Sequence, residues 1–337
     1  MLARHLVSRR PGQLALEEHD VPAQPPPGGI IARAAATAIS PGTEVTMYLG
    51  RAVLRPADST EPYYPGYSFA GVVVAAGEGA GFKPGDRVCG PLPHASLAAE
   101  SRPERLARLT VIPDGVSDPA AAMTQLGCIA LNAVRLARLQ LGDSVAVLGA
   151  GLVGLLACRF AHLSGARPVL AADPVASRRE LARVFGASAS ADPAELAARS
   201  GNGVPQTGFD VVFEASGTPQ GVLQAMRLAA RGGRVVLLGS TRGLVDGFDP
   251  YDDVHRKGVT VIGAHVSTAP AAATLADRWT EAANRRYLLG LLRDRVVEVS
   301  PLITDTIAPR DAGAMFADLA RAPGGRLGVI IDWEAAG

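Results

Sequence analysis

The chain has few cysteines, almost no net charge and no long apolar run, and each shortage excludes a class of protein. The 33 basic and 32 acidic residues give a net charge of +1 without a basic block, so we expect no nucleic-acid partner. The longest apolar run, 145–158, is too short to cross a membrane, and no apolar run follows Arg9 and Arg10 to make a signal peptide. No two of the three cysteines stand at metal-binding or redox spacing, which is typical of a protein of the reducing cytoplasm.

The pattern of apolar residues separates a β-rich part from a part that alternates strands with helices. With 337 residues, 48% of them apolar and 19% charged, the chain is long enough for two globular domains. The tail from about residue 270 returns to helix and short strands, such as 326–332, whereas residues 1–120 have short β-like runs at 30–36, 71–76 and 87–89 between Gly- and Pro-rich turns. These runs predict a compact β-rich domain.

The alternating part lies between residues 145 and 264. Its expected strands are 145–148, 168–172, 188–190, 209–213, 234–238 and 259–263, and its expected helices are 152–164, 175–185 and 219–230. Alternation of this kind predicts an α/β fold with a Rossmann-type, doubly wound parallel sheet.

The most informative motif is Gly149-x-Gly151-x-x-Gly154, which follows an apolar run and opens a helix. Gly149 permits a tight turn, Gly151 lets a pyrophosphate approach the backbone, and Gly154 lets the helix lie close to the sheet. The start of the helix, at Leu152 and Val153, presents N–H groups and the positive end of the helix dipole to phosphates. The motif predicts a dinucleotide site, and the alternative is a tight strand–helix turn in some other α/β protein.

An acidic residue at the end of the next apolar run selects the cofactor. Asp173 stands where a carboxylate can accept hydrogen bonds from both ribose hydroxyls of an adenosine. A carboxylate there repels a 2′-phosphate, so we expect NAD(H) rather than NADP(H). Arg178 and Arg179 are close in sequence and leave some tolerance of NADP open, and we expect Arg178 to lie along the adenosine ribose.

Two further strand ends supply candidate cofactor contacts, because ligands of doubly wound sheets bind beyond the carboxyl ends of the strands. Ser216 follows the run 209–213 and is expected to border the adenosine half. Gly239 and Ser240 follow the run 234–238 and are expected nearer the nicotinamide. In the alternative, these residues only shape their loops.

Longer motifs resemble the medium-chain dehydrogenase/reductase superfamily over nearly the whole chain. Residues 65–73, PGYSFAGVV, are similar to the family's PGHE-x-x-G-x-V, and residues 81–88 read GFKPGDRV, as its turn motif does. IPDGVS at 112–117 and Gly-Ala-His at 263–265 follow in the family's order.

This resemblance implies a GroES-like catalytic domain that is split around a Rossmann domain. The implied boundaries are 1–122 and 268–337 for the catalytic domain and 123–267 for the Rossmann domain, with the active site in the cleft. The resemblance also places His265 near the nicotinamide, and it implies a homodimer or homotetramer.

The metal ligands of the zinc-dependent family members are replaced in this chain. The family uses a Cys on the first catalytic loop, the His and Glu of PGHE, and a Cys or Glu before the Rossmann domain. Ser40 stands near the first position, Tyr67 and Ser68 at the second, and Thr124 or Gln125 at the third. None of these residue types is a good zinc ligand, and the lobe that carries a four-Cys structural zinc is missing. We therefore expect no metal.

A second resemblance narrows the activity. The loop S-x-G-T-E at 40–44, Pro93-His94 and ALNA at 130–133 are similar to a zinc-free branch that includes bacteriochlorophyllide a dehydrogenase and sugar-modifying dehydrogenases of biosynthetic clusters. It implies an enzyme that interconverts a secondary alcohol and a ketone on a sugar-like or biosynthetic small molecule. Two alternatives stay open: an NADPH-dependent double-bond (quinone or enoyl) or iminium reductase, and a catalytically silent NAD-binding sensor or scaffold.

Without zinc, a hydrogen-bonding side chain must act on the substrate oxygen. Tyr67 either donates to a carbonyl or fills the vacated metal position. Thr43 corresponds to the family's proton-relay hydroxyl, and Glu44 is either a general base or a loop anchor that accepts backbone N–H bonds. His94 is either an acid/base group that titrates near neutrality or a loop residue exposed to water.

Other histidines and tyrosines carry weaker expectations. We expect surface positions for His5, His19, His162 and His255. We expect either a substrate pocket or the core for Tyr48, Tyr63 and Tyr64.

Overall fold

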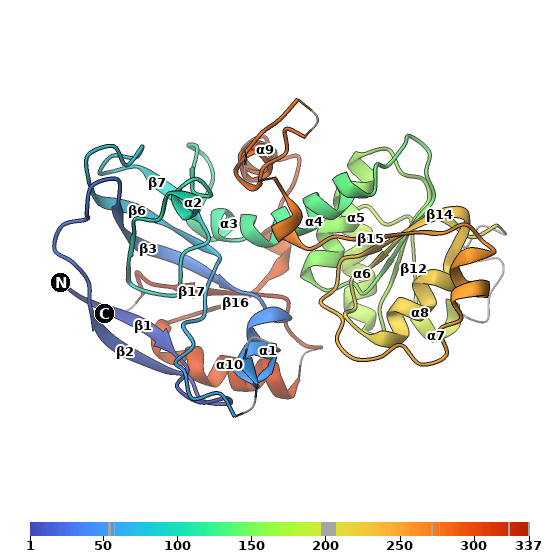
Figure 1. The fold of residues 1–337 in the computed structure, drawn as a ribbon, viewed down its shortest axis with the longest axis horizontal. Coiled ribbons are helices and arrows are strands. Elements are labelled where there is room, and N and C mark those ends of the chain that lie inside the picture. Colours follow the sequence, from blue (N-terminus) through green and yellow to red (C-terminus); the bar gives the residue numbers. More distant parts are fainter. Residues whose placement is uncertain are drawn as a thin grey trace. The chain divides into compact units, whose positions relative to one another are not determined.

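The chain folds as two compact units in the computed structural model (Figure 1). The structure describes residues 1–337 except 53, 54, 57, 197–206, 271, 276, 323, 336 and 337. The first unit consists of Met1–Leu126 with Pro270–Gly337, and the second consists of Gly127–Ala269.

The first unit is built on a seven-stranded sheet whose strands come from both ends of the chain. The sheet order is β16-β17-β3-β6-β7-β9, with β8 paired to β3. The strands are β3 (Ile30–Ile39), β6 (Phe69–Ala76), β7 (Arg87–Gly90), β8 (Leu97–Glu100), β9 (Thr110–Val111), β16 (Ile303–Ile307) and β17 (Gly328–Asp332). β17 pairs antiparallel with β3, so the end of the chain completes a sheet that begins near its start. β1 (Leu2–Val7) pairs with β2 (Ala15–Asp20), and β4 (Arg51–Ala52) with β5 (Arg55–Pro56).

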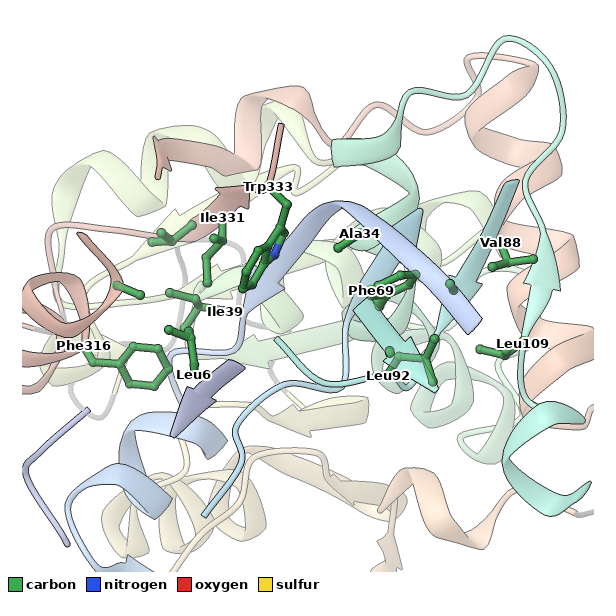
Figure 2. Packing of buried hydrophobic residues seen from close by; sticks show 14 of the residues in the cluster. Leu6, Ala34, Ile39, Phe69, Val88, Leu92, Leu109, Phe316, Ile331 and Trp333 are labelled. Atoms are coloured by element: carbon green, nitrogen blue, oxygen red, sulfur yellow. The ribbon is translucent and has the colours of Figure 1, made fainter. Parts of the chain in front are cut away.

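A cluster of buried apolar side chains holds the first unit together (Figure 2). Ile39, Phe69 and Ile331 enter it from β3, β6 and β17 and are fully buried. Phe316 enters from α10 (Ala312–Arg321), and the Trp333 indole N–H donates to Thr37 Oγ1 at 2.9 Å. Because β3 is buried on both faces, its sequence is a nearly continuous apolar run rather than an alternating one.

Four more helices belong to the first unit, and a fifth crosses the boundary between the units. The four are α1 (Thr43–Tyr48), α2 (Pro103–Leu106), α3 (Asp118–Ala122) and α9 (Glu281–Arg293). α4 (Thr124–Leu136) begins in the first unit and continues in the second.

The second unit is a six-stranded parallel sheet in the order β12-β11-β10-β13-β14-β15. The strands are β10 (Val145–Leu148), β11 (Val169–Ala172), β12 (Ala189–Ala191), β13 (Phe209–Glu214), β14 (Ala229–Leu237) and β15 (Thr260–Gly263). The helices include α5 (Leu152–Leu163), α6 (Ala176–Val184), α7 (Pro193–Leu196) and α8 (Pro219–Leu228). The predicted α/β fold with a doubly wound sheet is confirmed, and β10 lies at the point where the strand order reverses.

The helices of the second unit cover its sheet. α5 contacts β10, β11 and α6, whereas Val222 and Met226 of α8 pack in one cluster with Leu148 and Leu170. Among the described residues, no helix is long and apolar enough to pass through a bilayer.

One predicted element boundary in the second unit is wrong. The expected helix 219–230 ends at Leu228, and β14 begins directly at Ala229 instead of at 234. Ala229 pairs with Phe209 before a register shift, so the chain enters the sheet without a turn. A π-helix, Pro250–His255, lies between β14 and β15, and the Asp249 side chain caps it.

Two histidines lie elsewhere than expected, whereas other aromatic side chains match one of their expected positions. His5 and His19, expected at the surface, are half-buried on β1 and β2 with ring centroids 5.3 Å apart. Burial and the neighbouring His19 lower the pKa of His5. Tyr48 belongs to the core, where its hydroxyl donates to the Gly12 carbonyl at 2.6 Å. His162 and His255 are exposed, as expected.

Candidate active site

The glycine-rich turn joins β10 to α5, and each glycine has a different surrounding. Gly149 has φ +96°, and a Cβ there would lie 2.6 Å from the Ser216 nitrogen. A Cβ on Gly154 would lie 1.8 Å from the Gly149 oxygen, whereas one on Gly151 would meet nothing within 4 Å. α5 starts after Gly151 without a side-chain cap, so the N–H groups at Leu152 and Val153 face the open side of the turn.

Asp173 follows β11 and is tied to this turn. Its carboxylate is almost fully buried and accepts the Ala150 N–H at 2.8 Å and the Val175 N–H at 2.9 Å. Arg178 lies 3.8 Å from it. The Arg179 guanidinium donates to the Asp173 backbone carbonyl at 2.7 Å. The acid that was predicted to read the ribose therefore stands beside the predicted pyrophosphate turn.

The other predicted cofactor residues lie on loops after β13 and β14 or beyond β15. Ser216 donates both its N–H and its hydroxyl to Glu214, the last residue of β13. The Gly239 N–H donates to the Glu214 carbonyl at 2.6 Å, and Ser240 comes next in the chain. His265 is exposed and caps a short 3₁₀ turn, with Nδ1 2.6 Å from Ser267 Oγ.

The first unit brings together two hydroxyls and a carboxylate from its predicted catalytic residues, and the hydroxyl of Ser40 lies beside them. The Tyr67 phenol makes hydrogen-bonding contacts with the Ser40 and Thr43 side chains. Ser40 follows β3, Thr43 is the first residue of α1, and Tyr67 precedes β6, so three segments converge at the phenol. Burial and the negative charge of Glu44 raise the pKa of Tyr67, despite the opposing effect of the two hydroxyls.

Glu44 and His94 form a buried pair beside this cluster. Both side chains are completely buried, and Glu44 Oε1 lies 3.1 Å from His94 Nε2. Glu44 Oε2 accepts the Ser40 backbone N–H at 2.7 Å. A Cβ on Gly66 would lie 2.1 Å from the His94 nitrogen, so the segment before Tyr67 rests directly on His94. The alternative in which His94 is exposed to water is wrong.

The third candidate ligand position belongs to a hydrogen-bonded network around Arg285. Thr124 Oγ1 donates to the Ala121 carbonyl at 2.6 Å, and the Gln125 side-chain oxygen accepts from the guanidinium of Arg285. Arg285, on α9, is completely buried and pairs with Glu281 at 2.7 Å. Burial favours the neutral acid, yet the guanidinium groups of Arg285 and Arg108 hold the pKa of Glu281 below its usual value.

Sequence reasoning missed Glu214 and Arg285. Glu214 could have been found as an acidic residue that ends an otherwise mostly apolar strand. Arg285 gave no such signal, because it stands in a polar stretch of α9 next to a second arginine.

Two family models match this chain in the order of its folded parts. The alcohol dehydrogenase GroES-like domain matches residues 26–112, and the zinc-binding dehydrogenase model matches residues 153–283. The chain belongs to the medium-chain dehydrogenase/reductase superfamily. This is a superfamily of oxidoreductases, so the predicted resemblance is confirmed at this level.

Individual relatives of this superfamily member are distant. It is 31% identical to an L-threonine 3-dehydrogenase of Streptomyces coelicolor over 58% of this chain and 52% of that one. A 2-dehydro-3-deoxy-L-galactonate 5-dehydrogenase of Pseudoalteromonas atlantica is 27% identical over 86% of this chain and 87% of that one. The first curated relatives that the chain matches are L-threonine 3-dehydrogenases, and the chain spans about half of their length.

A solved structure shares the fold. A protein of Sinorhizobium meliloti, assigned to the zinc-binding dehydrogenases and bound to NADP, superposes with a TM-score of 0.80. It is 24% identical and covers 98% of this chain and 99% of that one.

The residues of this superfamily member fit a dinucleotide but not a zinc ion. The open side of Gly151, the uncapped start of α5 and the Asp173 carboxylate suit a pyrophosphate and a ribose. The candidate metal positions hold Ser40, Tyr67 with Ser68, and Thr124 or Gln125. The Thr124 hydroxyl donates to a backbone carbonyl, and a buried guanidinium that repels cations already occupies the amide oxygen of Gln125. Burial raises the pKa of the nearby Cys89 thiol, which opposes the thiolate form that zinc binds. No group of three or more His, Cys, Asp or Glu side chains among the described residues could hold a metal.

Proposed function

We propose that this protein is a zinc-independent, NAD(H)-dependent oxidoreductase that interconverts a secondary alcohol and a ketone on a sugar-like or biosynthetic small molecule. The observation that carries this proposal is the phenol of Tyr67 among the hydroxyls of Ser40 and Thr43, at the position where the family has its metal ligands. The sugar-acid dehydrogenase among the relatives supports an alcohol or ketone as the reacting group.

In the proposed reaction, the proton that the ketone oxygen receives comes from a side chain of this protein. When bound, the nicotinamide gives or accepts a hydride. Tyr67 keeps its proton at neutral pH because burial and Glu44 raise its pKa, so it can donate a hydrogen bond to a ketone oxygen. As that oxygen gains negative charge, the O–H bond of Tyr67 breaks and the proton moves to the oxygen. The hydroxyl of Thr43, which contacts the phenol, can then relay a proton from solvent water to the phenolate, giving up its own proton as it takes one from the water.

The surroundings of Tyr67 suit this direction better than the reverse. Oxidation of an alcohol would need the phenolate as base, and the raised pKa of Tyr67 opposes that form. The completely buried carboxylate of Glu44 lies close to the phenol, and its charge opposes a second negative charge on Tyr67. We therefore propose that Tyr67 acts as a proton donor in ketone reduction.

We propose NAD(H) as the cofactor because Asp173 places a carboxylate beside the glycine-rich turn. The free protein is expected to bind NADH at least about tenfold more tightly than NADPH, a difference of about 1.4 kcal/mol. The physical reason is repulsion between the carboxylate and a 2′-phosphate. Titration of the protein with each reduced cofactor, followed by calorimetry, measures the ratio.

Two variants sharpen the cofactor test. Asp173→Ser removes the charge and should bring the two dissociation constants closer together. Asp192→Asn removes a neighbouring carboxylate that pairs with Arg179 at 3.6 Å, and should leave their ratio unchanged. Tighter binding of NADPH than of NADH by the parent protein would contradict the assignment.

We further predict that the purified protein contains far less than one zinc per chain by elemental analysis. The donor set of Ser40, Tyr67 and Gln125 offers neither thiolate nor imidazole, and Arg285 adds a positive charge beside it. Treatment with a strong chelator should leave the melting temperature and the NADH affinity unchanged. Stoichiometric zinc that a chelator removes with loss of structure would refute the zinc-independent reading.

Activity itself is tested with a panel of ketones, enones, imines and secondary alcohols in the presence of each cofactor. Turnover of ketones or alcohols with NAD(H) supports the proposal. Reduction of a double bond with NADPH alone would favour the quinone or enoyl reductase alternative. Tight NAD(H) binding without turnover of any compound would favour the silent sensor.

A further inference from the structure

A buried carboxylate joins the loops that follow two neighbouring strands of the second unit. Glu214 is the last residue of β13, and its side chain is completely buried. Its Oε1 accepts hydrogen bonds from the N–H and the hydroxyl of Ser216 and from the Gly217 N–H at 3.0 Å. Its Oε2 accepts from the Thr241 hydroxyl at 3.0 Å, beyond the end of β14. One side chain therefore receives four donors from two separate loops.

The two loops are in direct contact around this carboxylate. A Cβ on Gly239 would lie 2.6 Å from the Gly217 nitrogen and 2.8 Å from Glu214 Oε2. The backbone carbonyl of Glu214 also accepts the N–H groups of Leu238, at 2.9 Å, and Gly239, at 2.6 Å. The main chain and the side chain of Glu214 thus both position the segment that leaves β14.

The loop that Glu214 orders is also a support of the glycine-rich turn. A Cβ on Gly149 would lie 2.6 Å from the Ser216 nitrogen, whose hydrogen Glu214 accepts at 2.8 Å. The Ala215 N–H donates to the Leu148 carbonyl at 2.7 Å, at the end of β10. The turn after β10, the loop after β13 and the loop after β14 therefore form one continuous backbone surface. It lies at the carboxyl edge of a parallel sheet, where ligands of such sheets bind.

We propose that Glu214 is a positioning residue for the dinucleotide, which holds the loops 215–217 and 239–241 in the arrangement that receives it. This inference rests on the proposed binding of a nicotinamide cofactor. Ser216, expected from the sequence to contact the cofactor, donates its N–H and its hydroxyl proton to Glu214, which therefore fixes its position. Without the carboxylate, the partly buried hydrogen bonds from the N–H groups of Ser216 and Gly217 would lose their acceptor, and the loops would move to regain one. Binding would then require the loops to be reordered, which weakens affinity.

The test is the affinity of Glu214→Gln for NADH, measured by calorimetry. Glutamine keeps the side-chain volume but puts an NH₂ group where one oxygen accepts hydrogen bonds. We expect the dissociation constant for NADH to rise about tenfold or more relative to the parent.

Asp210→Asn is the matched control on the same strand. Asp210, near the amino end of β13, accepts the Ser144 N–H at 2.8 Å and the Ser144 hydroxyl at 2.7 Å. Replacement of Asp210 also removes a carboxylate that joins β13 to the segment before β10. This contact lies at the amino edge of the sheet, opposite the edge where Glu214 lies. We expect a fall in melting temperature and an unchanged NADH affinity. If Glu214 only stabilises the fold, Glu214→Gln should also lower the melting temperature and leave the NADH affinity unchanged. That outcome overturns the proposal.

A second variant covers the case in which Glu214→Gln does not fold. Thr241→Val keeps the side-chain shape and removes only the hydrogen bond from the loop after β14. We expect several-fold weaker NADH binding, and parental affinity in this variant would overturn the proposal. If the parent itself binds neither NADH nor NADPH, the proposed function fails. If the parent binds and the variants bind equally well, only the role of Glu214 fails.

Discussion

Replacement of Gly151 by alanine is expected to weaken NADH binding at least about a hundredfold, or about 2.7 kcal/mol, while the melting temperature stays close to the parental value. A Cβ at this position meets no protein atom within 4 Å, so the fold should accept the methyl group. The same open space is where the second glycine of the motif lets a pyrophosphate approach the backbone. Calorimetric titration with NADH and thermal denaturation of the same samples measure the two quantities.

Two other glycines are controls for this prediction. Gly154→Ala would put a Cβ 1.8 Å from the Gly149 oxygen, so it should lower the free energy of unfolding by roughly 3 kcal/mol. Gly290→Ala, in α9, also meets nothing within 4 Å and should change neither affinity nor fold. Parental NADH affinity in Gly151→Ala would mean that no dinucleotide binds at this turn.

Tyr67→Phe is expected to lower kcat for ketone reduction by roughly 10² to 10⁴, the usual contribution of a positioned proton donor. The substitution removes one oxygen and leaves the ring that packs in the first unit. NADH affinity should not change, because the predicted cofactor contacts belong to the second unit. Steady-state kinetics on the best ketone of the panel, with NADH titration alongside, checks both statements.

The controls for Tyr67 are a tyrosine variant and the pH profile. Tyr64 is 45% exposed, and Tyr64→Phe should keep parental kcat. Because the pKa of Tyr67 is raised, the phenol keeps its proton up to at least about pH 10, and its ionisation should not reduce the rate of reduction below that pH. One other outcome would assign the proton to His94. In it, the rate of reduction falls with pH through an apparent pKa near neutrality, this pH dependence remains in Tyr67→Phe, and it is absent in His94→Ala. If both variants keep full kcat, neither residue is the donor.

The secondary structure of the second unit was largely predictable because its signals are local. The runs 145–148 and 168–172 are apolar without interruption, as is typical of strands covered on both faces, and Asp210 alone interrupts the run 209–213. The three runs became β10, β11 and β13 almost residue for residue. The glycine motif was predictable because its constraint is local in the sequence. A Cβ on Gly154 would lie 1.8 Å from the backbone oxygen of Gly149, so only glycine fits there. The boundary between α8 and β14 was missed because the pairing of Ala229 with Phe209 depends on a neighbouring strand.

The candidate site was predictable as a set of residues, but the sequence could not show what each residue contacts. Tyr67, Thr43 and Glu44 were singled out by position, and the structure brings them together with Ser40. The complete burial of His94 was not foreseen, since the sequence left open whether this residue is an acid/base group or a loop residue exposed to water. His94 is covered because the segment around Gly66 packs on its backbone and ring.

By itself, the sequence determined the fold class and the positions of the glycine-rich motif, of Asp173, and of Ser40 and Tyr67. All of these depend on residue types and on their spacing within short stretches of the sequence, which periodicity and motifs record directly. Only the tertiary structure decided the partners of the buried charges. Glu44 meets His94, and Arg285 meets Gln125 across 160 positions of sequence, because a charge without water must find its counterpart wherever the packed core brings one within reach.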